Sequence, residues 1–365
     1  MKNKNIFSVL ANRLNGPQSI GHSHVFWTIF FIFIILLFCF PLFFSEYEVV
    51  NLTYFFSNLF LAMGLSLIWG CGNILSFGQM AFFGLGGYAY GIIGINLIGV
   101  VNNTNLAFLG GILIPMAFAA ILGYFLFYGR VSGVYVTIIT LVSTLVFETF
   151  MAQTAGPQWA VGKALLGGYN GMTNIPSIQL QLFGFNKVFD GIPLYYFVLV
   201  LLIVVYFFLR YLVNSKYGNS LVATGSNPLR TEMLGYDIRL IQLIAFAIAG
   251  ALAGLSGVIY VAWGHYITPS TMGLTTAALP VIWVAVGGRK SILATIISAV
   301  VLQYFAQYLS VTGSEYAFVI LGALLMFVVM YVPQGVIPPI ANYLNKMGKR
   351  KLVEEPICLK EGEQT

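Results

Sequence analysis

Long apolar runs separated by short polar stretches dominate the pattern of this chain. Each long run is close to the roughly 20 residues that a helix needs to cross about 30 Å of hydrocarbon. The nine clear runs are Val25–Phe44, Asn51–Trp69, Phe82–Leu97, Ala107–Tyr128, Val134–Met151, Leu194–Leu212, Leu240–Trp263, Ile292–Leu309 and Ala317–Val332, and a tenth, weaker run is Ala277–Val286. The runs are continuous rather than alternating, which favours helices over a β-barrel. The pattern therefore predicts an all-α polytopic membrane protein with about ten transmembrane helices.

Composition supports this prediction. Hydrophobic residues make up 59% of the 365 residues and charged residues only 8%, whereas a soluble domain carries roughly 25% charged residues. There are too few charges to form a solvated shell, so apolar surface must face lipid. The three cysteines are scattered, which indicates neither a disulfide framework nor a metal site. We expect no cofactor and no bound metal.

Basic residues predict the orientation. With ten spans and a cytoplasmic N-terminus, almost every Lys and Arg falls in a cytoplasmic loop or end, and only Lys163 and Lys187 fall outside. The tenth run is needed for this, because without it the basic C-terminal cluster would lie outside. We expect a cytoplasmic segment at residues 1–24, a membrane domain at 25–340 and a charged cytoplasmic tail at 341–365. The net charge of +6 thus indicates topology, and no nucleic-acid partner is expected.

A polar island of mixed charge, Gly218–Asp237, separates two of the apolar runs. Its sequence predicts a short helix at Pro228–Leu234, in which Asn227 caps the start, Pro228 fits the first turn and Gly235 ends it. This helix presents Leu229, Met233 and Leu234, with Arg230 and Glu232 around them. Either a soluble cytoplasmic partner docks on the island, or the island is an amphipathic turn lying on lipid headgroups.

A glycine-rich block, Gly64–Gly91, contains a predicted helix break at Gly70–Gln79. Asn73 and Gln79 bring polar groups to the break, and Gly84, Gly86 and Gly87 thin the helix that follows. One interpretation is a discontinuous segment lining a pathway, since broken helices at membrane depth are tolerated where they are buried or line a cavity. The other is a cytoplasmic turn followed by a close-packing helix.

The longest predicted external loop is Thr154–Pro193. Within it, Gly167, Gly168, Asn170 and Gly171 are either part of an outer gate or docking surface, or ordered turns that use Gly and Asn for positive φ.

Two further side chains are pathway candidates. Glu148 is the only acidic residue well inside an apolar run, so it should face the bundle interior or water. It either contacts solute or protons, or is a structural or interfacial carboxylate. Trp283 is either a pathway wall or an interfacial anchor.

Enzyme chemistry is not indicated. The nearest approach to a phosphate-binding loop is Gly287–Ser291, but Arg289 stands where that motif requires Gly. The histidines give no metal spacing and no catalytic grouping. The chain therefore carries no ATP-binding motif of its own.

Several blocks in order resemble the permeases of branched-chain amino acid and urea ABC importers. They are the glycine-rich block Gly64–Gly91, Gly133–Leu141, Leu166–Thr173, the island ending at Asp237, the run Ala245–Val261, Ile282–Arg289 and Tyr331–Val336. The resemblance covers roughly residues 50 to 340. The blocks Ile282–Arg289 and Gly167–Thr173 are more similar to the urea branch.

The resemblance implies an inner-membrane permease subunit that pairs with a second, related permease. Two cytoplasmic ATPases and an external solute-binding protein would complete the importer, and Gly218–Asp237 would be the coupling element. It implies no enzymatic activity in this chain. An inverted repeat relating spans two to five and seven to ten is a further possibility. Few ionisable groups in the spans favour a neutral or zwitterionic solute, such as a branched-chain amino acid, urea or a short amide. A sugar-type ABC permease and an ion-coupled secondary transporter are the alternatives.

Overall fold

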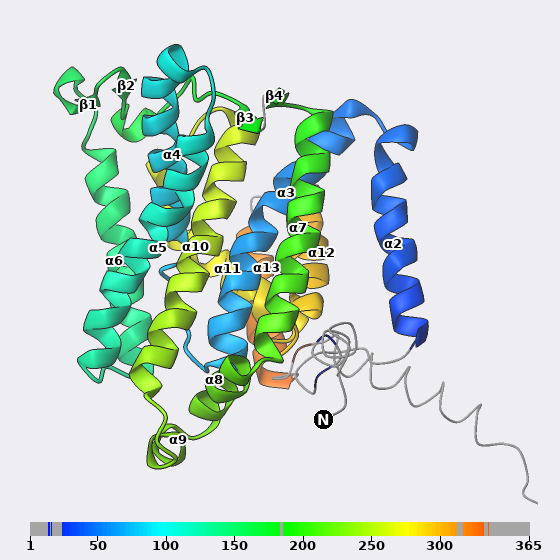
Figure 1. Cartoon of the computed structure of the whole chain (residues 1–365), viewed down its shortest axis with the longest axis vertical. Coiled ribbons are helices and arrows are strands. Elements are labelled where there is room, and N and C mark those ends of the chain that lie inside the picture. Colours follow the sequence, from blue (N-terminus) through cyan, green and yellow to red (C-terminus); the bar gives the residue numbers. More distant parts are fainter. Residues whose placement is uncertain are drawn as a thin grey trace, which may run out of the picture.

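The computed structural model describes residues 14, 16, 24–182, 185–311, 317–331 and 335, and it is a helical bundle (Figure 1). Most of the predicted N-terminal segment and all of the predicted tail lie outside the described residues. The long helices are α2 (His24–Phe43), α3 (Glu46–Leu65), α4 (Gln79–Val101), α5 (Asn105–Tyr128), α6 (Val134–Ala152), α7 (Ile192–Val213), α10 (Ile238–Gly264) and α12 (Ile292–Val311). Two shorter apolar helices are α11 (Leu274–Gly287) and α13 (Ala317–Tyr331). Every predicted span has a helix, so the predicted fold class is confirmed.

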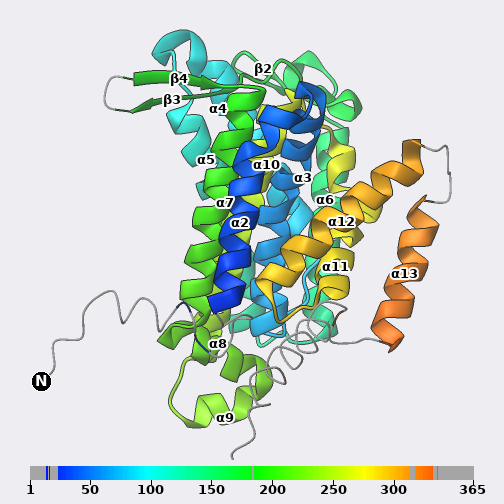
Figure 2. The ribbon, with the colours of Figure 1, turned by 90° about the vertical axis from the view of Figure 1, so that its right-hand side faces the viewer.

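The two ends of the bundle differ in structure. One end, here the strand end, carries the short strands β1 (Ala160–Val161), β2 (Ala164–Leu165), β3 (Ile178–Leu182) and β4 (Phe185–Phe189). The opposite end, here the α9 end, carries α8 (Lys216–Ser226) and α9 (Pro228–Met233), as Figures 1 and 2 show.

The described residues contain eight helices that are long and apolar enough to cross a membrane. The helix at the weak tenth run, α11, has only 14 residues, which span about 21 Å at 1.5 Å per residue. The chain nevertheless passes from one end to the other here. Ile267 pairs with Met172 at the strand end, and the Arg289 carbonyl accepts a hydrogen bond from the Ser66 hydroxyl at the α9 end. The first part of this crossing is non-helical apart from a 3₁₀ turn, η4 (Pro269–Met272).

Helix α10 lies at the centre of the bundle and packs against α3, α4 and α5. Close approach depends on glycine. A Cβ at Gly86 of α4 would lie 2.4 Å from the carbonyl oxygen of Gly254 in α10 and 2.8 Å from that of Gly111 in α5. Small residues thus let three backbones meet at one point, as is usual for helices packed in membranes.

The predicted break at Gly70–Gln79 is confirmed. Helix α3 ends in a turn of π-helix, η1 (Ser66–Cys71), and α4 begins at Gln79. The non-helical backbone between them is paired with α6: the Thr137 and Thr144 hydroxyls donate to the carbonyls of Leu75 and Phe77 at 3.1 Å each. The break is therefore satisfied by protein groups, which makes it compatible with membrane depth.

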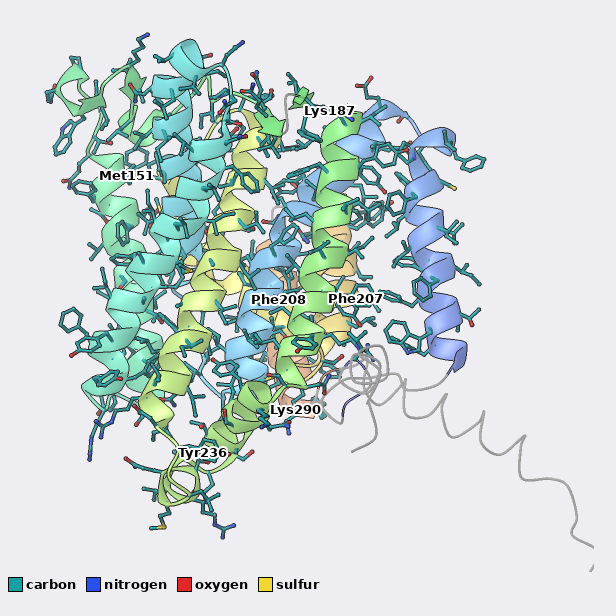
Figure 3. All side chains as sticks on the ribbon, viewed as in Figure 1. Met151, Lys187, Phe207, Phe208, Tyr236 and Lys290 are labelled. Atoms are coloured by element: carbon teal, nitrogen blue, oxygen red, sulfur yellow. The ribbon has the colours of Figure 1, made fainter. Side chains whose placement is uncertain are left out.

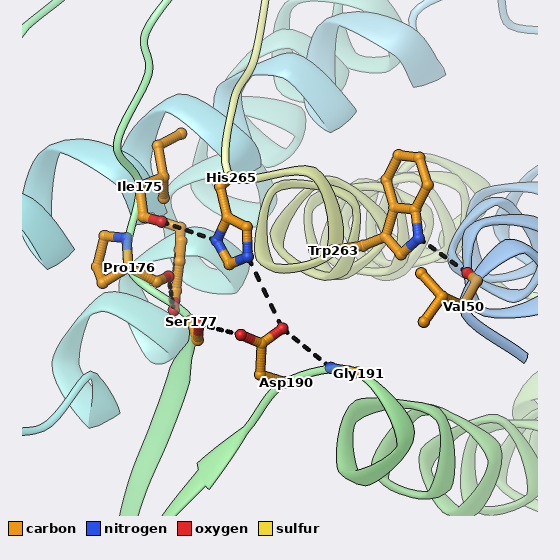
Figure 4. Close-up of polar contacts among 9 residues, drawn as sticks. Val50, Ile175, Pro176, Ser177, Asp190, Gly191, Trp263 and His265 are labelled. Atoms are coloured by element: carbon orange, nitrogen blue, oxygen red, sulfur yellow. Dashed lines mark hydrogen bonds and ion pairs between the residues drawn. The ribbon is translucent and has the colours of Figure 1, made fainter. Parts of the chain in front are cut away.

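The described residues of the long predicted external loop include paired strands that the sequence reading did not expect. Gly167, Gly168 and Gly171 have φ of +76°, +56° and +78°, and Asn170 closes the 3₁₀ turn η3 (Gly168–Asn170). The backbone angles of the three glycines agree with the turn interpretation, whereas Asn170 has no positive φ, and a role of this loop as an outer gate or docking surface stays a prediction. Polar contacts tie this loop to the end of α10 (Figure 4): His265 Nδ1 lies 3.1 Å from the Ile175 carbonyl oxygen and its Nε2 lies 3.7 Å from Asp190 Oδ1.

Candidate functional site

Helix α9 forms a capped, exposed projection at the α9 end. Asn227 Oδ1 accepts a hydrogen bond from the Arg230 amide at 3.0 Å, and Pro228 occupies the first helical position. The helix ends one residue earlier than predicted, because Leu234 is its C-cap, and Gly235 follows with φ of +85°.

The exposed surface of α9 is apolar at its centre. Leu229, Met233 and Leu234 are 70%, 86% and 77% exposed. Glu232 forms an ion pair with Arg239 at 3.9 Å, which links the helix to the start of α10. Three large apolar side chains held in solvent by a rigid, capped helix are typical of a surface that is covered by a partner.

The sequence reading missed α8, which holds α9 against the bundle. Its Ser215 cap accepts from the Gly218 amide, and its Leu221 is fully buried. The Tyr217 hydroxyl donates to the Ile241 carbonyl at 2.8 Å, and burial raises the pKa of this phenol. A Cβ at Gly225 would lie 2.5 Å from the Cys71 carbonyl oxygen. The projection therefore rests directly on the break between α3 and α4. Ser215 as a cap was the available signal, but the residues after it, which include two Gly, two Ser, one Asn and one Thr, have weak helix propensity.

A large cavity, here called the aromatic cavity, opens between α3, α4, η4, α10, α11 and α12. Its volume is about 780 Å³. One wall is aromatic: the rings of Tyr54 and Trp263 lie 4.9 Å apart, and that of Tyr260 is 5.3 Å from Phe83. Trp263 is held by its Nε1, which donates to the Val50 carbonyl at 2.8 Å (Figure 4).

The lining of the aromatic cavity also carries amides paired across α3 and α12. Asn51 Nδ2 donates to Gln307 Oε1 at 3.0 Å, and Asn58 Nδ2 donates to Gln303 Oε1 at 2.8 Å. Trp283 also lines this cavity. The described residues that line this cavity include no Asp, Glu, Lys or Arg. A solute with net charge would find no counter-charge there, which favours a neutral or zwitterionic one.

A smaller cavity of about 220 Å³, here called the basic cavity, lies at the α9 end. Trp69, Asn73, Gly225, Arg289 and Lys290 are among its lining residues. It therefore adjoins both the break and α8.

The predicted pathway residues fall into separate places. Trp283 lines the aromatic cavity and Asn73, with φ of +55°, lines the basic cavity. Gln79 is buried and lines neither. The three glycines of α4 lie in packed contacts. A Cβ on Gly84 would lie within 2.5 Å of Met272 atoms, and one on Gly87 would lie 2.5 Å from an Ile267 atom. Gly86 is packed in the same way against α10.

Glu148 is half-buried on α6, which packs against η4, and it lines neither the aromatic cavity nor the basic cavity. A Cβ on Gly273, the N-cap of α11, would lie 3.2 Å from Glu148 Oε1. The carboxylate therefore sits near the positive end of a helix dipole, which explains how an acidic side chain is tolerated at this depth.

Sequence reasoning missed the four amides of the aromatic cavity. Their signal was present, because Asn51 and Asn58 are seven residues apart and Gln303 and Gln307 four apart, spacings that place each pair on one helix face. No local sequence pattern predicts which neighbouring helix each of these faces contacts.

Fold and cavities together define a class: a polytopic membrane transport protein with no catalytic grouping among the described residues. The comparison with known families agrees and is more specific. Residues 49–329 match the model of the family described as "Branched-chain amino acid transport system / permease component". The chain belongs to this family, whose members are transport permeases and not enzymes.

The relatives have low sequence identity to this chain, but the alignments cover most of its length. The high-affinity branched-chain amino acid transport system permease protein LivM of Escherichia coli (strain K12) is 24% identical over 300 residues, which cover 77% of this chain and 67% of the relative. The probable branched-chain amino acid transport permease protein LivH of Methanocaldococcus jannaschii is 22% identical, covering 75% and 85%. The ribose import permease protein RbsC of Escherichia coli (strain K12) is 23% identical, covering 75% and 81%. No solved structure matches this chain.

Proposed function

We propose that this chain is the membrane-spanning permease subunit of an ATP-driven importer and that α9 couples it to a cytoplasmic ATPase. The observation that carries the proposal is the α9 surface, with its three exposed apolar side chains on a capped helix. The partners are a second related permease, two ATPase subunits and an external solute-binding protein. The family supports this assembly in general terms.

The α9 end is the cytoplasmic end. Lys290 and Tyr236 lie at this end in Figure 3, whereas Lys187 lies at the strand end. Arg239 lies 6.0 Å from the ring of Tyr128, which brings the junction of α5 and α6 to the α9 end as well. This distribution supports the orientation predicted from the positive-inside rule.

The solute is neutral or zwitterionic. Support comes from the uncharged lining of the aromatic cavity, which is the outward part of the pathway in this proposal. Branched-chain amino acids, urea and short amides are the candidates, and the similarity to RbsC adds ribose as the sugar-type alternative. Uptake of labelled leucine, urea and ribose by cells that carry the complete importer ranks them. Uptake that survives collapse of the ion gradient but stops on ATP depletion supports an ABC importer, whereas the reverse indicates an ion-coupled secondary transporter.

The coupling surface is tested by the double change Leu229→Asp with Met233→Asp. Burying two such side chains contributes about 3–6 kcal/mol before ordering costs, so we expect the ATPase to be lost from the purified complex while the permease stays folded in the membrane. The matched control is Val161→Asp with Leu165→Asp, two exposed apolar residues at the strand end, which should leave ATPase co-purification unchanged. Wild-type assembly and transport by the α9 variant would show that α9 is not the docking site.

Gly235→Val tests the geometry of the same helix. With φ of +85° and no atom within 4 Å of an added Cβ, the change strains the backbone without a clash. We expect assembly to be partly retained while ATP hydrolysis is uncoupled from uptake, as measured in proteoliposomes.

A further inference from the structure

Aromatic side chains are concentrated around the aromatic cavity. They make up more than a third of the described residues that line it, against 16% of the whole chain. Five of these residues, here called the ring cluster, are Tyr54 of α3, Phe83 of α4, Tyr260 and Trp263 of α10, and Tyr266 just beyond α10. Both α3 and α4 pack against α10, so the ring cluster is built by helices that are in direct contact.

Tyr260 joins the members of the ring cluster. Its ring centroid lies 5.3 Å from that of Phe83 and 6.1 Å from each of those of Tyr54, Trp263 and Tyr266. Its hydroxyl donates to the Tyr266 hydroxyl at 3.4 Å. Rings that already pack against one another have little freedom left to lose when a ligand binds, so the cluster is preorganised. Tyr266 is 40% exposed, which makes it the most accessible member.

The ring cluster is the feature of this cavity that can attract a positive charge. The face of an aromatic ring carries partial negative charge and attracts a cation that lies over it. The described residues of the lining include no Asp or Glu, and moving an ammonium group out of water without a partner is costly. The phenol oxygens of the cluster can also accept hydrogen bonds from such a group.

We propose that the ring cluster is the subsite that binds the ammonium group of the transported solute. This inference rests on the proposed transport function and narrows it. The solute is then a zwitterion such as an amino acid, because urea and ribose carry no cation for the rings to bind. The rings take the place of a carboxylate partner, so the subsite recognises an ammonium group while the lining itself stays uncharged.

The test compares two probes of the same shape, choline and the neutral alcohol in which carbon replaces its quaternary nitrogen. The full chain is purified in lipid nanodiscs with its membrane partners, and binding of each probe is titrated by saturation-transfer NMR, with empty nanodiscs as the blank. We expect choline to bind about tenfold more tightly, the range of a desolvated cation–π contact. An uncharged cavity without this contribution gives the opposite order, because the neutral alcohol costs less to desolvate.

Ring-removing and ring-preserving variants locate the preference. Tyr54→Leu and Tyr266→Leu should each lower the ratio of the two affinities at least threefold, whereas Tyr54→Phe and Tyr266→Phe should keep it within twofold of wild type. Thermal unfolding of each variant confirms that it is folded, and the accessible position of Tyr266 favours a folded variant there. The matched control is Tyr169→Leu, which removes a ring that is 81% exposed at the strand end and should leave the ratio unchanged.

Equal binding of the two probes by the wild type, or tighter binding of the neutral alcohol, would overturn the inference. A preference for choline that survives in both Leu variants would place the cation elsewhere. A preference lost equally in the Phe variants would assign it to the hydroxyls and not to the rings. Failure of the proposed function looks different, since the importer would then take up none of leucine, urea or ribose in an ATP-dependent way, whatever the probes show.

Discussion

At the scale of one residue, the position of Glu148 in the structure changes the interpretation of its carboxylate. In the sequence it is an isolated acid within an apolar run, which makes it a candidate for solute or proton contact. In the structure its carboxylate lies beside Gly273 at the start of α11. A negative charge at a helix N-terminus is stabilising, so the structural interpretation gains a physical basis.

We therefore expect Glu148→Gln to keep most uptake, because the amide preserves the shape and one acceptor oxygen. Glu148→Lys should lower assembly, since it places a positive charge at the positive end of α11. Uptake rates at matched expression check both. A loss beyond about tenfold in the Gln variant, roughly 1.4 kcal/mol in barrier, would instead indicate a direct role of the carboxylate in transport.

At the scale of elements, the contact between α3 and α12 depends on paired amides. Asn58 Nδ2 reaches Gln303 Oε1, and Gln303 Nε2 donates in turn to the carbonyls of Phe55 and Ala299. Such pairs hold two helices together without a charge.

Gln303→Leu should destabilise the purified permease by about 1–3 kcal/mol, because it leaves the buried Asn58 amide without its partner on α12. Adding Asn58→Leu should recover part of that loss, since two apolar side chains then meet. Thermal unfolding in detergent of the two single variants and the double variant checks this as a double-mutant cycle. Additive losses would show that the two amides do not interact.

At the scale of the whole molecule, the distribution of Lys residues between the two ends of the bundle supports the orientation that we propose. Lys163 and Lys187 belong to the strand end, and Lys216 begins α8 at the other end. Ten crossings with both ends cytoplasmic stays a prediction, as does the inverted repeat.

Single cysteines placed at these positions test the orientation in intact cells, in a background without the three native cysteines. An impermeant thiol reagent should label positions 163 and 187 and leave positions 216 and 349 unlabelled, the last of which lies outside the described residues. External labelling at position 216 would reverse the proposed topology and remove α9 from the cytoplasm.

Sequence alone determined the features that local physics controls. Apolar runs had to be helices because backbone groups in lipid must be paired within the segment. The α9 cap was readable because Asn227, Pro228 and Gly235 act on neighbouring backbone within a few residues. The break after α3 was readable for the same reason, since glycines and polar residues interrupt an apolar run.

Tertiary structure alone decided which faces meet. The aromatic cavity combines residues from Tyr47 to Val311, and its Asn58–Gln303 pair joins positions 245 apart in the chain, so no local pattern could reveal it. The glycines of α4 show the same limit, because flexibility, packing and pathway lining look alike in sequence. Only the structure assigns Gly86 to packing, since an added Cβ would lie 2.4 Å from the Gly254 carbonyl oxygen. The weak tenth run became the short helix α11, and the segment before it is a 3₁₀ turn, Pro269–Met272, that follows the Met172–Ile267 bridge. Long-range contacts of this kind are set by the packing of the whole bundle, which propensity and periodicity do not encode.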